Sequence, residues 1–284
     1  MNGEKIYSGK KVVVTGSSGF IGKNLVDRLK AEGAQVIEIS RQLNYDITNW
    51  DSIKSIQKID VIFHLAALSF IPLTQKNPMK TFNTNVLGTL NVLELCRLNK
   101  AKMIFTSSYV YGKPKYLPID EEHPLNPSNT YSQSKLIGEN LCEAYNKEYD
   151  LDIIILRLFN TYGKNQKQDF LIPSIIKQCY KGEVSLKDPY PKRDFININD
   201  VIQAYIQAGM YHKNNFGIFN IGSGKSYSVR RIAEIISSKF EPRPKLNYSH
   251  ERRNNEIMET IADISFANAE LNWTPLISLE KGIK

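Results

Sequence analysis

The chain has 284 residues, of which 42% are apolar and 23% charged, and its formal net charge is +8. It has no apolar run of the roughly 18–20 residues that a membrane helix needs, and its lysines and arginines are dispersed, so we expect neither a membrane protein nor a nucleic-acid-binding protein. The three cysteines and four histidines lack disulfide-framework or metal-ligand spacing, which predicts a cytoplasmic protein without a metal.

The first 160 residues alternate short β-branched runs with segments of helical period. We expect strands at 11–16, 34–40, 60–67, 102–108 and 152–160, and helices at 19–32, 50–57, 78–99 and 131–149. Strand–helix alternation of this kind predicts an α/β fold with a parallel, doubly wound sheet. The nearly continuous apolar strands indicate that helices cover both faces.

After residue 163 the alternation loosens. We expect helices at 170–181, 199–212 and 228–240, and one more strand at 216–222 that returns to the main sheet, whereas the tail 241–284 is mixed. These patterns predict a large domain over residues 1–163, to which 196–222 returns. A smaller C-terminal lobe is expected over 164–284.

The first strand ends in the turn TGSSGFIG, which contains Gly16, Gly19 and Gly22. Glycines at these places allow a sharp turn, close approach of backbone to a pyrophosphate, and tight packing of the next helix, whose free N–H groups favour phosphate. The sequence therefore predicts a nicotinamide dinucleotide held by this turn, including Ser18, Phe20 and Ile21.

The end of the second strand is expected to contact the adenosine ribose. Ser40 and Arg41 stand there, and a guanidinium suits a ribose 2′-phosphate, which favours NADP(H). A shifted register would place Glu38 on the 2′-hydroxyl instead and make NAD(H) the cofactor. We expect Asp46 and Ile47 near the adenine, with a turn aspartate as the alternative for Asp46.

Tyr131 and Lys135 lie four residues apart near the start of a predicted helix, and hence on one face. A neighbouring ammonium lowers a tyrosine pKa and so enables acid/base work near neutrality. Ser107 or Ser108, at the end of the strand 102–108, could bond the same substrate oxygen.

Eight motifs together resemble the extended short-chain dehydrogenases/reductases, in the NAD-dependent epimerase/dehydratase branch that acts on sugar nucleotides. They are TGSSGFIG (15–22), HLAA (64–67), NVLGT (85–89), SSYVYG (107–112), YSQSK (131–135), RLFNTYG (157–163), RDFININDV (193–201) and FNIGSGKSYSV (219–229). The resemblance implies a Rossmann-type dinucleotide-binding domain followed by a substrate-binding lobe. It also implies a homodimer built from the helices 78–99 and 131–149.

By this resemblance, Ser107, Tyr131 and Lys135 are the catalytic residues, with Ser107 a better match than Ser108, and Asn85 lies near them. The cofactor site further includes Leu65, Ala66 and Ala67, while His64 is expected to be a packed core residue. The resemblance assigns the substrate to Ser69, Ser107, Ser108, Tyr109, Asn160, Arg193, Arg253 and Glu256. Arg193 and Arg253 are expected to bind the diphosphate. The family usually reads Arg-Pro-Gly-Asp where this chain has Arg253-Asn254-Asn255-Glu256. This difference places the ribose contact expected of Glu256 in question.

The same resemblance distinguishes among the reactions that members of this family catalyse. Dehydratases of this type need an Asp-Glu pair where this chain has Ser108-Tyr109, and the Cys–His pair of the C3/C5 epimerases has no counterpart, so both reactions are disfavoured. We expect an NADP(H)-dependent reductase of a 4-keto-6-deoxy sugar nucleotide. The alternatives are an NAD-dependent 4-epimerase of the UDP-glucose/UDP-galactose type and, less favoured, a non-catalytic dinucleotide sensor.

Overall fold

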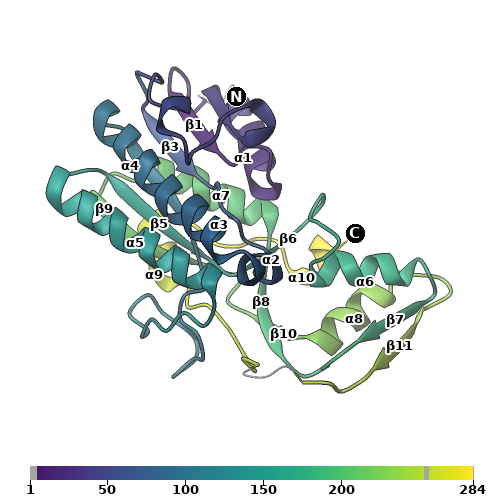
Figure 1. The fold of residues 1–284 in the computed structure, drawn as a ribbon. Helices are drawn as coiled ribbons and strands as arrows, with labels where there is room; N and C mark the ends of the chain where they lie inside the picture. The colour runs from purple at the N-terminus through teal and green to yellow at the C-terminus, as the bar shows by residue number, and fades with distance from the viewer. Residues whose placement is uncertain (1–4, 253–255, 284) are drawn as a thin grey trace.

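A six-stranded parallel sheet forms the centre of the computed structural model, which describes residues 5–252 and 256–283 (Figure 1). Its strands are β1 (Lys11–Thr15), β2 (Gln35–Ile39), β3 (Val61–His64), β4 (Lys102–Ser108), β5 (Ile153–Leu158) and β9 (Phe216–Ile221). They lie in the order β2-β1-β3-β4-β5-β9, and every pairing is parallel. The predicted doubly wound sheet is confirmed, and the strand order reverses between β1 and β3, where such sheets bind ligands.

Helices cover both faces of this sheet. One face packs against α1 (Phe20–Ala31), α7 (Ile198–Gly209) and α9 (Ser265–Leu271), and the other against α4 (Gly88–Asn99) and α5 (Thr130–Tyr149). The side chains of β1 show why its sequence is uninterrupted valine: Val12 and Val14 enter the first core, and Val13 the second. A strand buried on both faces needs apolar residues at every position.

The predicted helix 78–99 is divided in the structure. It consists of α3 (Pro78–Phe82), one π-helical turn η3 (Asn83–Leu87) and α4, and the short α2 (Ile71–Lys76) precedes it. Asn77 separates α2 from α3 with φ −130° and ψ 65°, outside the helical region that the following Pro78 disfavours. The π turn buries Asn85.

The predicted helix over 50–57 is wrong. The segment forms only the 3₁₀ turn η2 (Trp50–Ser52), after a similar turn η1 (Arg41–Leu43). Initiating a helix is costly, and eight residues with one fully buried side chain, Ile53, provide little packing to offset that cost.

The remaining elements form a smaller lobe beside the main sheet (Figure 1). It contains a sheet of β6 (Asn160–Tyr162), β8 (Lys192–Asn197) and β10 (Ser226–Ser228), the pair β7 (Glu183–Leu186) and β11 (Lys245–Tyr248), and the helices α6 (Leu171–Cys179), α8 (Val229–Ser237) and α10 (Leu279–Gly282). The lobe has a hydrophobic core of its own, with Ile175 and Ile232 fully buried. Within residues 5–252 and 256–283, no helix combines the length and apolar character that crossing a bilayer requires.

Candidate functional site

The glycine turn after β1 forms a cradle at the carboxyl edge of the sheet. Gly16 has φ +70°, and a Cβ there would lie 2.8 Å from the backbone nitrogen of Ala66. A Cβ on Gly22 would overlap the carbonyl oxygen of Gly16, so α1 packs as closely as predicted. Gly19 caps α1 without a side-chain hydrogen bond. The turn thus leaves first-turn N–H groups for an anion, and the partly exposed Ser18 lies within it.

Two buried serine hydroxyls beside this cradle have no partner among the described residues: Ser17 Oγ and Ser40 Oγ. A buried hydroxyl without a hydrogen bond costs stability, and a polar ligand would supply the missing partner. The position of Ser40, directly after β2, is where a dinucleotide ribose is expected. The residues present therefore fit a bound dinucleotide.

The acidic and basic candidates at the end of β2 differ in their positions and in their ion pairs. Glu38 pairs with Val14 inside the sheet, and its carboxylate accepts from Lys30 Nζ at 2.7 Å. Arg41 follows the end of the strand, is exposed, and has no ion pair within the described part of the chain. Glu38 is thus the penultimate residue of β2 and is ion-paired with Lys30, whereas Arg41 lies beyond the last residue of the strand.

The residues after β3 form the opposite wall of the cradle. Thr15 Oγ1 accepts from the backbone N–H groups of Leu65 and Ala66, each at 3.2 Å. The ring of His64 is fully buried between Thr15 (2.7 Å) and Thr89 (3.0 Å), and burial lowers its pKa to about 3. His64 is therefore a neutral core residue, as the sequence predicts.

The other residues predicted near the cofactor and the sugar are accounted for as follows. Asp46 Oδ1 accepts from the N–H and the hydroxyl of Thr48, both at 2.9 Å, so this carboxylate holds a turn. Ile47 is buried against Gly88. Ala67 is partly buried and Ser69 is exposed on the segment after β3.

Tyr131 and Lys135 lie in the first turns of α5, which Asn129 and Ser132 cap with reciprocal hydrogen bonds. Lys135 is 1% exposed; its Nζ donates to the carbonyl oxygen of Thr106 at 2.6 Å, and burial lowers its pKa to about 8. Burial raises the pKa of Tyr131, and a side-chain hydrogen bond with Ser108 acts in the opposite direction. The expectation that Lys135 lowers this pKa is thus not met, since its ammonium is directed at the Thr106 carbonyl.

The two serines at the end of β4 have different partners. Ser107 is 1% exposed and donates from Oγ to Oε1 of Glu139, one helical turn beyond Lys135. Glu139 in turn forms a buried ion pair with Arg157 on β5, with Arg157 Nη2 2.7 Å from Glu139 Oε2. Ser108 is partly exposed and contacts Tyr131.

Asn85, in the π turn, connects two parts of the site. Its Nδ2 donates to the carbonyl oxygen of Leu68 (3.1 Å) and to Ser134 Oγ (2.8 Å), and its Oδ1 accepts from the N–H of Leu68 (2.8 Å). Ser134 Oγ donates to the carbonyl oxygen of Tyr131 at 2.7 Å. Asn85 therefore fixes the first turn of α5 relative to the chain after β3.

The residues predicted to hold the substrate diphosphate gather on the small lobe side. Asn160 Nδ2 donates to the carbonyl oxygen of Asp194 at 3.1 Å, and Arg193, next along β8, forms an ion pair with Glu256. Burial raises the pKa of Tyr109, while the nearby charge of Arg193 acts in the opposite direction. Arg253 lies outside the described residues.

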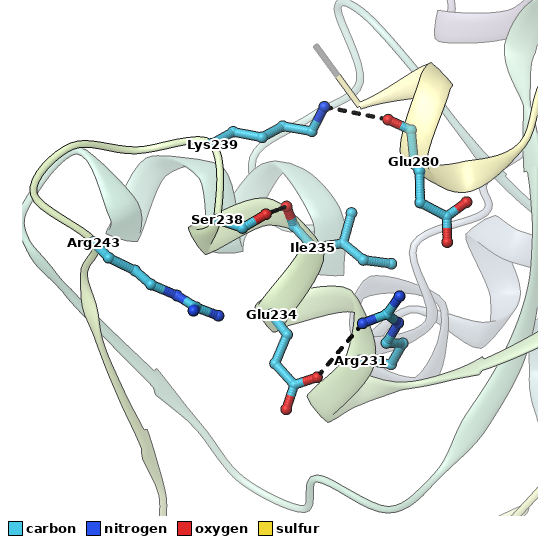
Figure 2. A pocket seen from close by; sticks show the side chains of 7 residues that line it. All are labelled: Arg231, Glu234, Ile235, Ser238, Lys239, Arg243 and Glu280. Atoms are coloured by element: carbon cyan, nitrogen blue, oxygen red, sulfur yellow. Dashed lines mark hydrogen bonds and ion pairs between the residues drawn. The ribbon is translucent and has the colours of Figure 1, made fainter.

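A separate hollow in the small lobe contains none of the predicted site residues. Figure 2 shows this cavity of about 400 Å³, lined by residues of α8, α10 and the segment after α8. Two of its charged side chains have partners within the lining: Arg231 lies 4.0 Å from Glu234, and Lys239 donates to the backbone carbonyl oxygen of Glu280. Among the described residues, no group of three or more histidine, cysteine, aspartate or glutamate side chains could hold a metal ion.

Sequence reasoning missed four buried polar residues that organise the site. Glu139 and Arg157 hold Ser107, and Thr15 holds the chain after β3. Asp194 accepts from the N–H groups of Ser223, Gly224 and Ala262 and so fixes the loops around β8. A charged residue inside an otherwise apolar strand, as at Arg157, was the available signal for such a partner.

The fold and this edge define a dinucleotide-binding α/β protein with a Tyr–Lys pair at the start of α5. Residues 12–222 match the family described as the NAD dependent epimerase/dehydratase family. A putative UDP-glucose 4-epimerase of Methanocaldococcus jannaschii is 34% identical over 96% of both chains. Solved structures that resemble the chain include RMD from Pseudomonas aeruginosa with NADPH (26% identity, TM-score 0.89) and UDP-glucose 4-epimerase with UDP-glucose from Thermotoga maritima (27%, 0.90), each covering 96% of both chains.

The chain belongs to the NAD dependent epimerase/dehydratase family. The predicted relationship with the extended short-chain dehydrogenases/reductases is confirmed, and so is the prediction of a nicotinamide-dependent enzyme of the sugar-nucleotide type.

Proposed function

We propose that the enzyme reduces the 4-keto group of a 4-keto-6-deoxy sugar nucleotide with NADPH. The observation that carries this proposal is that the acidic and the basic side chain at the end of β2 differ in their ion pairs. Glu38 forms an ion pair with Lys30, whereas Arg41 is exposed at the place where a ribose 2′-phosphate is expected. A net reduction consumes one reduced cofactor per turnover, for which NADPH is the usual donor. The likeness to RMD, solved with NADPH, is consistent with this choice.

In this proposal the glycine turn and the N-terminus of α1 bind the pyrophosphate, and Ser40 and Arg41 bind the adenosine ribose and its phosphate. The bound cofactor supplies a hydride to C4. Tyr131 supplies the proton to the C4 oxygen, and a serine hydroxyl of β4 donates a second hydrogen bond to it. Lys135, with its pKa lowered to about 8, provides a positive charge near the site at neutral pH.

The substrate is proposed to lie between this edge and the small lobe. Arg193 and Asn160 are placed to bind its diphosphate, and a guanidinium fork suits phosphate oxygens. Tyr109 and Ser69 would border the sugar. Arg253 and Glu256 are proposed at the same end, with Glu256 first released from its ion pair with Arg193.

A second candidate, an NAD-dependent 4-epimerase, is favoured by the 34% identity to a putative UDP-glucose 4-epimerase. The same Tyr131 would then remove and return the proton of the C4 hydroxyl. Calorimetry of cofactor-free protein with NADPH and NADH separates the two. Preference for NADPH together with NADPH oxidation by a 4-keto-6-deoxy sugar nucleotide supports the reductase; NAD retained through purification and interconversion of UDP-glucose and UDP-galactose would replace it with the epimerase.

Tyr131→Phe tests the chemistry common to both candidates. The variant should lose turnover while keeping its cofactor affinity, because only the phenolic hydroxyl is removed. Unchanged turnover would exclude Tyr131 as the proton donor and refute this mechanism, whereas a wild-type protein that binds cofactor but shows no turnover would favour the non-catalytic dinucleotide sensor. UDP-glucuronate belongs in the substrate panel, since UDP-glucuronic acid decarboxylases, one of Danio rerio among them, are also similar in sequence (26% identity).

We also propose a homodimer that buries the outer faces of α4 and α5. Leu98 on α4 is 58% exposed and Tyr149 on α5 is 48% exposed, although the two helices pack side by side. Light scattering should give twice the mass of the chain, and Leu98→Glu should shift the protein toward the monomer. A monomeric wild-type protein would contradict this assembly.

A further inference from the structure

The two hydroxyls at the end of β4 differ in what can reach them. Ser107 is 1% exposed, and the side chain with which it shares a face of the sheet, Phe105, is fully buried. Ser108, the last residue of the strand, is partly exposed, as is Tyr131. A substrate oxygen that contacts Tyr131 therefore has access to Ser108 without displacing any element of the fold.

The hydroxyls also differ in whether their proton is available. A serine has one O–H proton, and a carboxylate can only accept hydrogen bonds. The Glu139 carboxylate forms an ion pair with Arg157, whose Nε lies 3.1 Å from Oε1 and whose Nη2 lies 2.7 Å from Oε2. The hydrogen bond between Ser107 and Glu139 must therefore use the Ser107 proton, which leaves Ser107 only as an acceptor.

Reduction of a ketone needs the opposite property. Negative charge develops on the C4 oxygen as the hydride adds to carbon, and groups that donate hydrogen bonds stabilise it. Ser107 can donate to a substrate only by abandoning the buried Glu139 carboxylate, which would lose that hydrogen bond. The proton of Ser108 is under no such demand, because its partner, the Tyr131 phenol, can itself donate.

We propose that Ser108 is the catalytic hydroxyl that contacts the reacting C4 oxygen together with Tyr131, and that Ser107 is a positioning residue that ties β4 to the Glu139–Arg157 pair. The inference rests on the proposed function and deepens it. C4 gains the hydride, the carbonyl electron pair moves to oxygen, and that oxygen takes the Tyr131 proton to give a hydroxyl and tyrosinate. The O–H bond of Ser108 stays intact throughout.

The test compares Ser107→Ala and Ser108→Ala with the conservative Ser108→Thr in the complete enzyme with its cofactor and substrate. Ser108→Ala should lower kcat by about 10²–10³, as expected for loss of one donor to the developing charge, and Ser108→Thr should restore part of it. Ser107→Ala should lower kcat less than tenfold and lower Tm. The pH profile is the second readout: Ser108→Ala should move the alkaline limb that reports Tyr131 to higher pH, and Ser107→Ala should leave it in place.

A larger loss of kcat in Ser107→Ala than in Ser108→Ala would overturn the proposal, as would an alkaline limb that moves only in Ser107→Ala. If both variants lose activity, the pH profile decides by the same criterion. A wild-type enzyme without NADPH-dependent reductase activity would defeat the proposed function alone. The serine comparison is then read in the 4-epimerase reaction, where the same hydroxyl and Tyr131 act on the same C4 oxygen.

Discussion

The Glu139–Arg157 ion pair provides a direct test of how the site is held together. Both side chains are almost inaccessible, with 4% of Glu139 and 3% of Arg157 exposed. Glu139→Gln keeps the shape of the side chain but removes its charge. The remaining partners of Arg157, the Tyr111 hydroxyl at 3.0 Å and the Glu121 carbonyl oxygen at 3.1 Å, are neutral. The guanidinium would then lose its ion pair within the described residues, and only the charge of Glu121, which forms no ion pair with it, would remain nearby.

Breaking one side of a buried pair costs about 3–5 kcal/mol, a large part of the roughly 5–15 kcal/mol by which proteins are stable. The same helix offers a matched control in Glu143, which pairs with Lys147 at the surface, where 48% and 71% of the side chains are exposed. Exposed pairs four residues apart on a helix contribute only about 0.3–0.5 kcal/mol. We therefore expect Glu139→Gln to destabilise the enzyme by several times as much as Glu143→Gln.

Urea unfolding followed by circular dichroism measures both variants under identical conditions. The double variant Glu139→Gln, Arg157→Met should recover most of the loss, because it removes the unpaired charge as well. A free energy of unfolding for Glu139→Gln within about 1 kcal/mol of that for Glu143→Gln would show that the ion pair is not a major contributor, contrary to the burial argument.

Three further results are expected. Arg41→Ala should raise the Kd for NADPH by about 10–100-fold, the equivalent of one charged hydrogen-bond partner, and leave NADH binding unchanged in calorimetry; equal losses for both cofactors would rule out a 2′-phosphate contact. Glu256→Gln should weaken UDP or GDP binding by about tenfold because the proposed contact with the nucleotide loses its charged acceptor, whereas tighter binding would show that Glu256 acts mainly through its ion pair with Arg193. The pKa of His64 is lowered to about 3 in the folded protein, so between pH 3 and about 6.5 the unfolded chain binds a proton that the folded chain does not. The free energy of unfolding therefore decreases as the pH is lowered, by about 2 kcal/mol at pH 5. His64→Gln should flatten this pH dependence of urea unfolding; a variant with the same pH dependence as the wild type would contradict the buried, neutral assignment.

The main sheet could be predicted from the sequence because its strands are buried on both faces. The valines of β1 read as a continuous apolar run, and each helix between strands has an apolar face of helical period. The small lobe gives no such signal. Its strands β6 (Asn160–Tyr162) and β10 (Ser226–Ser228) have three residues each and are mostly polar, so periodicity has nothing to act on.

The position of the site was also predictable, although its hydrogen bonds were not. Glycines that require positive φ or close packing fix the turn after β1, and the spacing of Tyr131 and Lys135 fixes one face of α5. That spacing places the two residues on the same face of the helix, but it does not determine where the end of the long lysine side chain lies. Lys135 reaches the Thr106 carbonyl, and burial outweighs the hydrogen bond of Ser108 in setting the direction in which the pKa of Tyr131 moves.

Glu139 connects the stability of the enzyme with the assignment of its two serines. It is the acceptor of Ser107, so Glu139→Gln perturbs Ser107 directly, whereas Ser108 and Tyr131 do not contact it through any hydrogen bond in residues 5–252 and 256–283. If Ser108 is the reacting hydroxyl, Glu139→Gln should lower the free energy of unfolding far more than it lowers kcat, and the alkaline limb of the pH profile should keep its position. If Ser107 contacts the C4 oxygen, a change of its acceptor alters the availability of the proton it donates, and kcat must fall together with stability. The ratio of the two effects in one variant therefore reports which serine contacts the C4 oxygen.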